Sequence, residues 1–421
     1  MSQSPVLHQQ PPPDHVIRRQ YKVWRAAAPF LYEVVLYQGL IWPSNSVQFL
    51  RGSSSPQSLQ CLIGAATSNA DQPHLLLMEV QLPPVYSPAV RRDITGAHSS
   101  VTHTAGKIKT LSAWPSSSDI RRIQLVRGIA RSLAACIGDD DPIVSLYDIG
   151  ALSSGQIPGR QSAVVPPELR KCSRLVGLGG LNTEASALTS SPLQAGRVAA
   201  GSADNGVYTW DVQACPDPIT GFVPPVLSLN GHDAIVTDLH YSPLQPSSLA
   251  SASDDKTVLV WDDRTEECSL SLPLPCAGSA VEWSPFDSTV LACGGDNGIL
   301  YIWDVRRPDS PIHSLHDGCN RAPFYMTRIA WAPFKRDVVA TSGTNRRVMI
   351  WDLSQQGASQ TVDEAAEGPP ELAFIHGGHT ATINDFDWST DSPWTIASVS
   401  ENNILEIWAI SETLRSPPES S

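Results

Sequence analysis

Short apolar runs separated by polar turns recur along most of this chain, and this pattern predicts β-strands. In the clearest units, a strand ends in an aromatic residue, a strand of small residues follows, and a β-branched strand then ends in Trp. The aromatic residue precedes that Trp by 20 positions in four units: Tyr241 to Trp261, Trp283 to Trp303, Trp331 to Trp351 and Trp388 to Trp408. A constant internal spacing of this kind indicates a repeat architecture.

Three weaker units extend the pattern toward the N-terminus. Ser190 replaces the aromatic residue 20 positions before Trp210, a degenerate unit ends at Tyr147, and the earliest unit contains the apolar runs around Cys61 and Val80. Seven units lie within the range of blade numbers at which four-stranded repeats close into a ring. The sequence therefore predicts an all-β fold, a seven-bladed propeller over residues 33–410.

The segment before the first strand has a different period. Four apolar residues recur there at i, i+4, i+7 and i+11, which places them on one face of a helix. They are Ile17, Tyr21, Trp24 and Ala28. Pro29 lacks the backbone N–H that would continue the helix, so we expect it to end or kink the helix. Residues 15–32 are therefore assigned to an N-terminal helix and its connection to the propeller.

The two ends of the chain are polar. Residues 1–14 are rich in Pro and are predicted to be disordered. The tail at 411–421 ends in Ser-Pro-Pro-Glu-Ser-Ser and is expected to fray. The Ser- and Pro-rich segments 83–106 and 150–173 predict surface loops.

The composition agrees with many short strands and limits the kind of partner. Of 421 residues, 41% are hydrophobic and only 17% charged, and the chain contains 35 Pro and 28 Gly. A formal net charge of −13 argues against direct binding of nucleic acid and favours a basic protein partner, although acidity alone also keeps a protein soluble. No apolar run approaches the roughly 20 residues needed to span a bilayer, so no membrane partner is expected.

The cysteines indicate a reducing compartment. The eight Cys residues form no C-x-x-C pair and fall mostly in apolar runs, as buried free thiols do. The N-terminal sequence has the pattern of neither a signal peptide nor a transit peptide. We therefore expect a cytosolic or nuclear protein.

The repeat residues can form a buried hydrogen-bonded chain from the indole N–H through a hydroxyl to an imidazole and then to a turn side chain. One such chain would join Trp261, Ser251 or Ser253, His232 and Asp255, and another Trp408, Ser398 or Ser400, His379 and Asn402. This interpretation makes both histidines structural rather than catalytic.

No motif for catalysis or for a cofactor stands out. His376-Gly-Gly-His379 and His313-Ser-Leu-His316 have the spacing of a metal pair, but neither is accompanied by Cys or acidic ligands at a known zinc spacing. Nucleotide-binding loops and nucleophile elbows are also missing from the sequence. We therefore predict no catalytic residue, no cofactor and no metal.

Two segments resemble a known family. Residues 16–43 read Val-Ile-Arg-Arg-Gln-Tyr-Lys-Val-Trp-Arg-Ala-Ala-Ala-Pro-Phe-Leu-Tyr through Ile-Trp-Pro, and residues 367–410 contain Gly-Pro-Pro-Glu-Leu-Ala-Phe-Ile-His-Gly-Gly-His. Both resemble the retinoblastoma-associated, MSI-type family of WD40 histone-binding proteins. The resemblance implies a propeller with the N-terminal helix packed on its side, and an acidic loop inserted in the sixth blade.

In that family, the helix and the acidic loop together form a groove for the first helix of histone H4. The resemblance places the groove here at Phe30, Leu31 and Val34 on one wall, Phe374 and Ile375 on the other, Leu414 at one end, and Asp363, Glu364 and Glu367 in the acidic loop. An apolar trough with carboxylates at its rim suits a basic amphipathic helix. The alternatives are that Phe30 and Leu31 only pin the helix to the blade, and that the acidic loop only aids solubility.

The family also binds Arg- and Lys-rich peptides, such as the histone H3 tail, on the propeller face. The resemblance assigns this site to Trp42, Asp119, Glu184 and Glu401. The chain departs from the family there: Thr237 and Tyr325 replace Glu, Ser186 and Thr327 replace aromatic residues, and Arg121 adds a positive charge. We therefore expect a working side groove and an altered or lost face site.

The sequence thus predicts a non-enzymatic chromatin subunit that binds histone H4 or the H3–H4 pair. It would present the histone to an acetyltransferase, a chromatin assembly factor, or a Polycomb or deacetylase complex. The alternative is a substrate receptor of a cullin-type ubiquitin ligase, because Trp261-Asp-Asp-Arg264 and Trp303-Asp-Val-Arg306 match the Trp-Asp-x-Arg pattern of such receptors.

Overall fold

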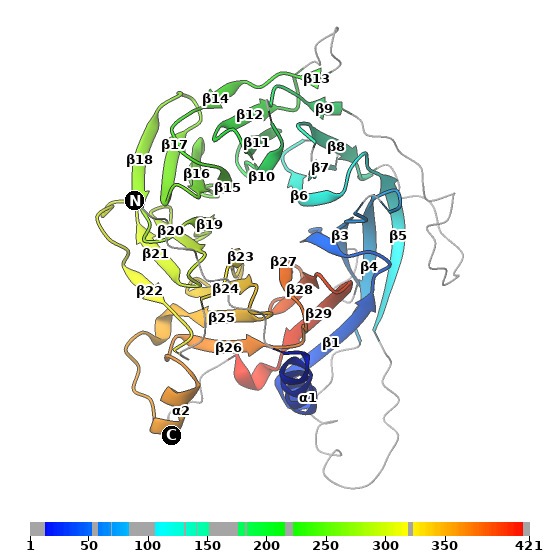
Figure 1. Ribbon diagram of the computed structural model, residues 1–421, viewed down its shortest axis with the longest axis vertical. Coiled ribbons are helices and arrows are strands. Elements are labelled where there is room, and N and C mark those ends of the chain that lie inside the picture. The colour runs from blue at the N-terminus through cyan, green and yellow to red at the C-terminus, as the bar shows by residue number, and fades with distance from the viewer. Residues whose placement is uncertain are drawn as a thin grey trace.

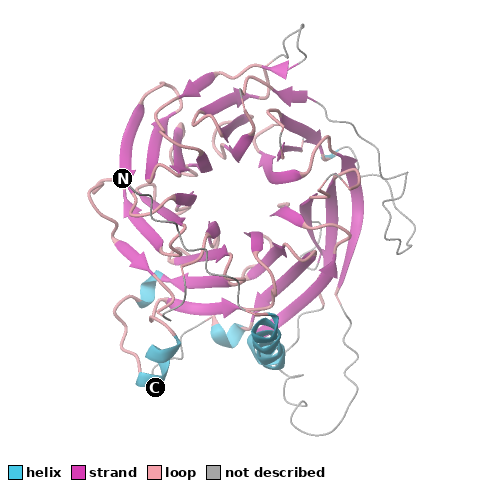
Figure 2. Ribbon diagram, viewed as in Figure 1, coloured by secondary structure: helices cyan, strands magenta, loops and turns pink. Residues whose placement is uncertain are grey.

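Seven antiparallel sheets are arranged as blades around a central channel (Figure 1), which confirms the predicted seven-bladed propeller. This computed structural model describes residues 13–52, 58–68, 70–83, 106–129, 132–139, 141–150, 176–181, 183–214, 222–318 and 323–415. Residues 1–12 of the predicted tail at 1–14, and most of both predicted loops at 83–106 and 150–173, lie outside these residues, whereas Asp14 of that tail is helical. Figure 2 shows that strands make up almost all of the ring and that the helices lie at its edge.

The first three blades follow the order of the chain. Blade 1 contains β2 (Ser44–Phe49), β3 (Ser58–Ala65), β4 (His74–Gln81) and β5 (Lys107–Pro115). Blade 2 contains β6 (Ile120–Val126), β7 (Leu133–Gly138), β8 (Val144–Asp148) and β9 (Val176–Leu178), with β13 (Phe222–Val223) added parallel to β9. Blade 3 contains β10 (Ala185–Ser190), β11 (Arg197–Ser202), β12 (Val207–Asp211) and β14 (Leu227–Leu229).

Three more blades follow in the same order. Blade 4 contains β15 (Val236–Tyr241), β16 (Ser248–Ser253), β17 (Thr257–Asp262) and β18 (Cys268–Pro273). Blade 5 contains β19 (Gly278–Trp283), β20 (Val290–Gly295), β21 (Leu300–Asp304) and β22 (His313–Leu315). Blade 6 contains β23 (Met326–Trp331), β24 (Val338–Gly343), β25 (Val348–Asp352) and β26 (Leu372–His376).

Blade 7 closes the ring with strands from both ends of the chain. It contains β27 (Ile383–Trp388), β28 (Thr395–Ser400), β29 (Ile404–Ile410) and, at its outer edge, β1 (Tyr32–Gly39). Val35 of β1 pairs with Trp408 of β29. The segment that carries the N-terminal helix is therefore fixed to the last blade.

The spacing of 20 residues has a simple geometric origin. In blade 5, Trp283 lies opposite Leu291 on the next strand, and Leu291 lies opposite Trp303 on the strand after it. The same row of three residues recurs in blades 4, 6 and 7. The two aromatic residues of a unit are thus at one level of one sheet, and their spacing is fixed by the lengths of two strands and two turns.

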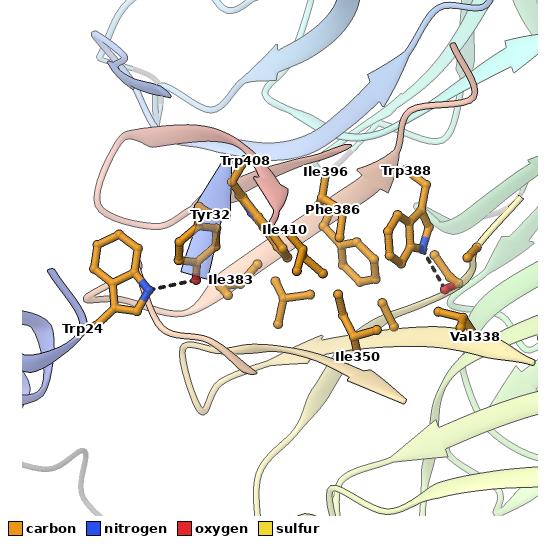
Figure 3. Packing of buried hydrophobic residues seen from close by; sticks show 14 residues of the cluster. Trp24, Tyr32, Val338, Ile350, Ile383, Phe386, Trp388, Ile396, Trp408 and Ile410 are labelled. Carbon is orange, nitrogen blue, oxygen red and sulfur yellow. Dashed lines mark hydrogen bonds between the residues drawn. The ribbon is translucent and has the colours of Figure 1, made fainter. Parts of the chain in front are cut away.

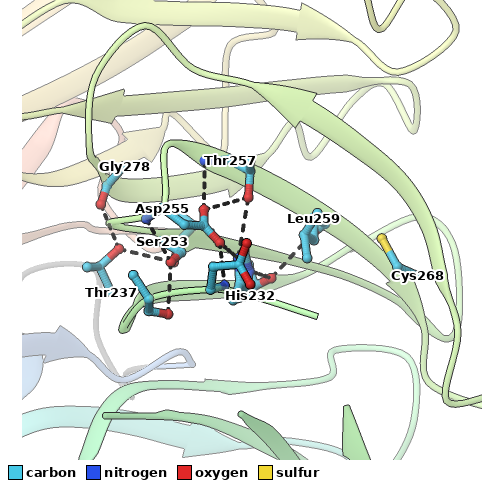
Figure 4. A network of polar contacts seen from close by, with 12 residues as sticks. His232, Thr237, Ser253, Asp255, Thr257, Leu259, Cys268 and Gly278 are labelled. Carbon is cyan, nitrogen blue, oxygen red and sulfur yellow. Dashed lines mark hydrogen bonds and ion pairs between the residues drawn. The ribbon is translucent and has the colours of Figure 1, made fainter. Parts of the chain in front are cut away.

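The predicted hydrogen-bonded chain is present in blade 4. The indole N–H of Trp261 donates to Ser251 Oγ at 2.8 Å, and His232 Nε2 lies 2.6 Å from the same oxygen. His232 Nδ1 lies 2.7 Å from Asp255 Oδ2 (Figure 4). Ser253, the alternative, instead donates to the carbonyl of Ala234. Burial lowers the pKa of His232, which fits a neutral structural imidazole.

The helix α1 (Asp14–Leu31) does not end at Pro29, as the sequence had suggested. Pro29 removes only the one hydrogen bond that its N–H would have made, and the N–H of Tyr32 still bonds to the carbonyl of Ala28. The last turn of the helix therefore survives, and α1 leads directly into β1. Among the described residues, no helix is both long and apolar enough to cross a membrane.

Part of the predicted C-terminal tail is ordered. The short helix η5 (Glu412–Leu414) lies against the junction of α1 and β1, where the N–H of Ser411 donates to the carbonyl of Leu31 at 2.9 Å. Arg415 pairs with Glu33 at 2.8 Å. The prediction that the whole tail frays is therefore wrong for residues 411–415, and residues 416–421 lie outside the described part.

Blade 6 carries the insertion that the sequence predicted as an acidic loop. It contains the short helices η4 (Leu353–Gln355) and α2 (Val362–Glu367), and it joins β25 to β26. Thr361 and Glu364 form a capping box that fixes the start of α2. The insertion is therefore partly helical, and it lies on the same side of the ring as α1 (Figure 1).

Candidate groove between the N-terminal helix and blade 6

One face of α1 packs onto the core of blades 6 and 7, as its period predicted. Trp24 is buried, and its indole N–H donates to the hydroxyl of Tyr32 at 2.8 Å (Figure 3). Tyr21 and Ala28 pack against the same cluster. This face is the anchor of the helix on the propeller.

A second apolar stripe of α1 lines a groove. The groove has a volume of about 590 Å³ and runs between α1, the edge strand β26 and the turn between β24 and β25. Val16, Val23, Ala27 and Leu31 recur along the helix at the spacing of one face, and they line the groove opposite Ile375. The anchor residues Tyr21 and Trp24 form part of its floor.

The stripe exposes large apolar side chains. Val23 is 65% exposed, and Phe30, three residues after Ala27 on the helix surface, is 77% exposed. Single exposed apolar residues are ordinary, but two on one stripe beside a groove are typical of a binding surface. The sequence pattern contained this stripe at i, i+7 and i+11 from Val16, yet only the anchor face was recognised.

The predicted apolar groove residues lie in different places in the structure. Leu31 and Ile375 line the groove. Phe374 instead packs into the core, with its ring 5.4 Å from that of Tyr32 and 6.2 Å from that of Trp408. Val34 is partly buried in β1, and Leu414 is 46% exposed on η5, beside the end of α1.

The predicted acidic residues lie apart from the lining of the groove. Asp363, Glu364 and Glu367 are exposed on α2, and none of them lines the groove. Hydrogen bonds from the backbone N–H and the hydroxyl of Thr361 lower the pKa of Glu364. At the other end, the lining includes the cationic residues Arg19, Arg346 and Arg347.

The propeller-face residues have structural roles that the sequence did not indicate. Asp119 is buried and accepts hydrogen bonds from the backbone of Thr67 and Ser68 at 2.6 Å each, which occupies both carboxylate oxygens. Glu184 lies 3.9 Å from Arg121, which also bonds to Asp139 at 2.9 Å. Glu401 is exposed, and Trp42 is partly buried.

The small polar residues of the face bind the neighbouring blades. Thr237 donates to the carbonyl of Gly278 at 2.8 Å, Thr327 donates to that of Ile383 at 2.7 Å, and Ser186 donates to that of Val236. Each donor sits at a β-bulge near the start of an inner strand. These hydroxyls therefore connect successive blades.

A half-buried histidine on the inner strand β15, His240, is expected to make folding sensitive to acid. His240 Nδ1 accepts a hydrogen bond of 3.1 Å from the backbone N–H of Trp283 on the neighbouring blade 5. His240 Nε2 lies 3.7 Å from the carboxyl group of Glu282. Burial, together with the positive charges of Arg328 and Arg127, lowers the pKa of His240 to about 3. A proton on Nδ1 would break the bond to Trp283.

We expect His240 to destabilise the protein as the pH falls from about 6.5 toward 3. The pKa of His240 in the folded protein lies below its ordinary value of about 6.5. The contribution of neutral His240 to the free energy of unfolding is therefore complete above pH 6.5. Below that pH it falls by at most about 1.4 kcal/mol per pH unit. His240→Gln, which keeps an acceptor for Trp283, should show a flatter fall in the free energy of unfolding, measured by urea denaturation. His316→Gln, at an exposed position, is the control. Equal pH profiles for wild type and His240→Gln would contradict the assignment.

Two family models match the sequence. The model described as histone-binding protein RBBP4, or the C subunit of the CAF1 complex, matches residues 19–84, which include most of α1, all of β1 and the first three strands of blade 1. The model of the WD domain, G-beta repeat, matches residues 224–262, 277–304 and 371–409. The match to a histone-binding family thus includes the helix that lines the groove.

Proposed function

Because the chain belongs to the WD40 histone-binding family of the RBBP4 and MSI type, we propose that it is a non-enzymatic histone-binding subunit. In this proposal, the first helix of histone H4 lies in the groove between α1 and β26. The observation that carries it is the apolar stripe of α1, where Val23 and Phe30 are exposed beside the groove that Ile375 lines.

The apolar stripe suits an amphipathic helix, and the carboxylates for its positive residues lie on α2, outside the lining that carries Arg19, Arg346 and Arg347. Such a helix would bury its apolar face against the stripe, as helices do in apolar grooves. The carboxylates of α2 and the net charge of −13 would attract its positive residues. The H3–H4 pair would bind through the same helix of H4.

We infer a nuclear location and a role as a shared histone-holding subunit. Complexes that acetylate histones, assemble chromatin, or repress it through Polycomb or deacetylase activity all need a subunit that holds a histone in place. Neither direct binding to nucleic acid nor binding to a membrane is part of the proposal.

The proposal is tested by calorimetric titration of the protein with a peptide of the first helix of H4. A saturable isotherm with one site per chain supports it, and the heat should be lost when the apolar residues of the peptide are replaced by Ser. Lack of binding at a peptide concentration of about 1 mM, which corresponds to roughly 4 kcal/mol of binding free energy, would reject the groove.

A ubiquitin ligase receptor is the second candidate, because the structure exposes both arginines of the Trp-Asp-x-Arg pattern. The side chains of Arg264 and Arg306 are 74% and 70% exposed, and each pairs with the Asp two residues before it. A pull-down with a cullin-ligase adaptor and with histones H3 and H4 separates the two functions. Capture of the adaptor but not of histones would favour the ligase.

The acidic helix should act mainly on the rate of association. Asp363→Asn removes an exposed charge from α2 without touching the capping box. We expect the association rate constant for the H4 peptide to fall about twofold to threefold at low salt, with little change in dissociation, because exposed charges steer encounter. Surface plasmon resonance at about 50 mM and 500 mM salt measures this, and screening should remove the difference. Asp309→Asn, on blade 5, is the matched control, and an effect confined to dissociation would contradict the role.

We expect the propeller face to bind an H3 tail peptide more weakly than micromolar. Asp119 is occupied by backbone donors, and Thr237 and Thr327, which replace a Glu and an aromatic residue of the family, are bonded to neighbouring blades. None of these three side chains is therefore free to hold an Arg side chain. Fluorescence anisotropy with a labelled H3 tail peptide measures the affinity, and binding of the H4 peptide by the same sample shows that the protein is active. A dissociation constant in the micromolar range or below would contradict the expectation.

A further inference from the structure

Two histidines and a glutamate meet in a buried cluster beneath the groove. His376 is the last residue of β26, His379 follows it by three residues, and Glu406 lies on β29 of the next blade. They are 0%, 5% and 1% exposed. One nitrogen of each histidine and one carboxylate oxygen all lie within 4.8 Å of one another. The acidic partner that the His-Gly-Gly-His spacing lacked in the sequence is thus supplied from a distant strand.

The distances are close to those of a metal site. His376 Nε2 lies 3.0 Å from Glu406 Oε2, and His379 Nδ1 lies 3.7 Å from Glu406 Oε1. In a tetrahedral zinc site with bonds of about 2.0–2.1 Å, neighbouring ligand atoms are about 3.3 Å apart. The ligand atoms all lie within 4.8 Å of one another, so they would have to approach to about 3.3 Å to surround one ion.

The charges of the cluster favour a cation. Among the described residues, both ion-pair partners of Glu406 are histidines. The other polar contacts of the two imidazoles are with hydroxyl groups of Tyr32, Ser398 and Ser400. A carboxylate buried without a cationic partner is costly unless it takes up a proton, and a divalent ion would supply the compensating charge.

We propose that His376 Nε2, His379 Nδ1 and a carboxylate oxygen of Glu406 bind a zinc ion. Two histidines, one carboxylate and a water molecule form a known zinc ligand set. The other nitrogen of each imidazole already has a partner: His376 Nδ1 lies 2.9 Å from the hydroxyl of Tyr32, and His379 Nε2 lies 2.7 Å from Ser398 Oγ. Such outer partners fix the tautomer of a metal-binding histidine.

The surroundings allow the ion to enter and hold the ligands in place. His379 and Gly377 line the groove, which connects the cluster to solvent. Gly378 is required beside the carboxylate, because a Cβ there would collide with Glu406 Oε2. Zinc would displace the hydrogen bond of 2.8 Å between His379 Nδ1 and Ser400 Oγ, and Ser400 would keep its bond to Asn402.

Bound zinc would cross-link blade 6 to blade 7 directly under α1. His376 stacks on Trp408 at 4.1 Å and contacts Trp24 edge to face. The ion would thus join the floor of the groove to the anchor of the helix. This role concerns the metal-loaded fold and does not depend on the binding of a histone.

The test is a zinc titration of the full chain after dialysis against a chelator. We expect about one zinc per chain by elemental analysis after desalting, and a rise of several degrees in the melting temperature with added zinc. Glu406→Gln keeps the size of the side chain and removes the charge. Its affinity for zinc should be at least tenfold lower, and its melting temperature should not respond to zinc.

Cysteine is the main competing ligand, so Cys268→Ser is the matched control. Cys268 is the exposed free cysteine of the described residues, and its replacement should leave zinc binding unchanged. Cobalt gives a second readout, because a tetrahedral site should show visible absorption in the wild type that Glu406→Gln lacks. Unchanged zinc binding in Glu406→Gln, loss of binding in Cys268→Ser, or lack of zinc binding by the wild type would each overturn the proposal. None of these measurements contains a histone, so failure of the H4 groove would not affect them.

Discussion

Val23→Glu is expected to lower the affinity for the H4 helix at least 100-fold while leaving the fold intact. Val23 is 65% exposed in the middle of the apolar stripe, so a glutamate is fully hydrated there in the free protein. A helix whose apolar face binds in the groove would remove that water from the carboxylate, at a cost of a few kcal/mol. A 100-fold loss corresponds to about 2.7 kcal/mol, which is ordinary for a residue at the centre of an interface.

Calorimetric titration with the H4 helix peptide measures the loss, and thermal unfolding checks the fold. A change at an exposed position should alter stability by no more than about 0.5 kcal/mol. Leu244→Glu, at a 44% exposed position on blade 4, makes the same chemical change far from the groove and should bind like the wild type. Equal affinities for the two variants would show that the helix binds elsewhere.

Phe30 is the better second position, and Phe374 is unsuitable. The ring of Phe374 packs against Tyr32 and Trp408, so its removal would disturb the blade as well as any ligand. A loss of binding in that variant would then have two explanations. Exposed residues of the stripe avoid this ambiguity.

The fold could be predicted from the sequence because the residues that indicate it lie close together along the chain. The row of Trp283, Leu291 and Trp303 lies within one blade, so its spacing is fixed by strand and turn lengths that are readable along the chain. The anchor face of α1 was also readable from its period, since a helix repeats every 3.6 residues. Of the two outcomes expected at Pro29, an end or a kink, the helix does not end there, because a proline in the last turn removes only one hydrogen bond.

The site was harder to predict because its parts meet only through the closure of the ring. Glu406 lies 30 positions from His376, and they become neighbours because β29 and β26 belong to adjacent blades. Arg346 enters the lining of the groove through a turn of blade 6 that has no marker in the sequence. Asp119 illustrates the opposite error, since this acidic residue at a family position is bonded to the turn between β3 and β4 of the neighbouring blade.

Trp24→Ala is expected to release α1 from the propeller. Trp24 is the buried anchor of the helix: it donates to Tyr32, contacts His376 and packs beside Tyr21. Removing a buried Trp side chain costs about 3–5 kcal/mol. An 18-residue helix is only marginally stable alone, so this loss should appear as local unfolding of α1.

Hydrogen exchange followed by mass spectrometry measures this release. Amides within Asp14–Leu31 should exchange at least 100-fold faster in Trp24→Ala, while those of the inner strands of blades 2 to 5 keep their protection. Trp24→Phe keeps most of the packing and loses only the bond to Tyr32, so it should cost about 1 kcal/mol. Trp24→Ala should also fail to bind the H4 peptide, because α1 forms one wall of the groove. Wild-type exchange across α1 in Trp24→Ala would mean that the remaining contacts of the helix hold it in place, and that the anchor lies elsewhere.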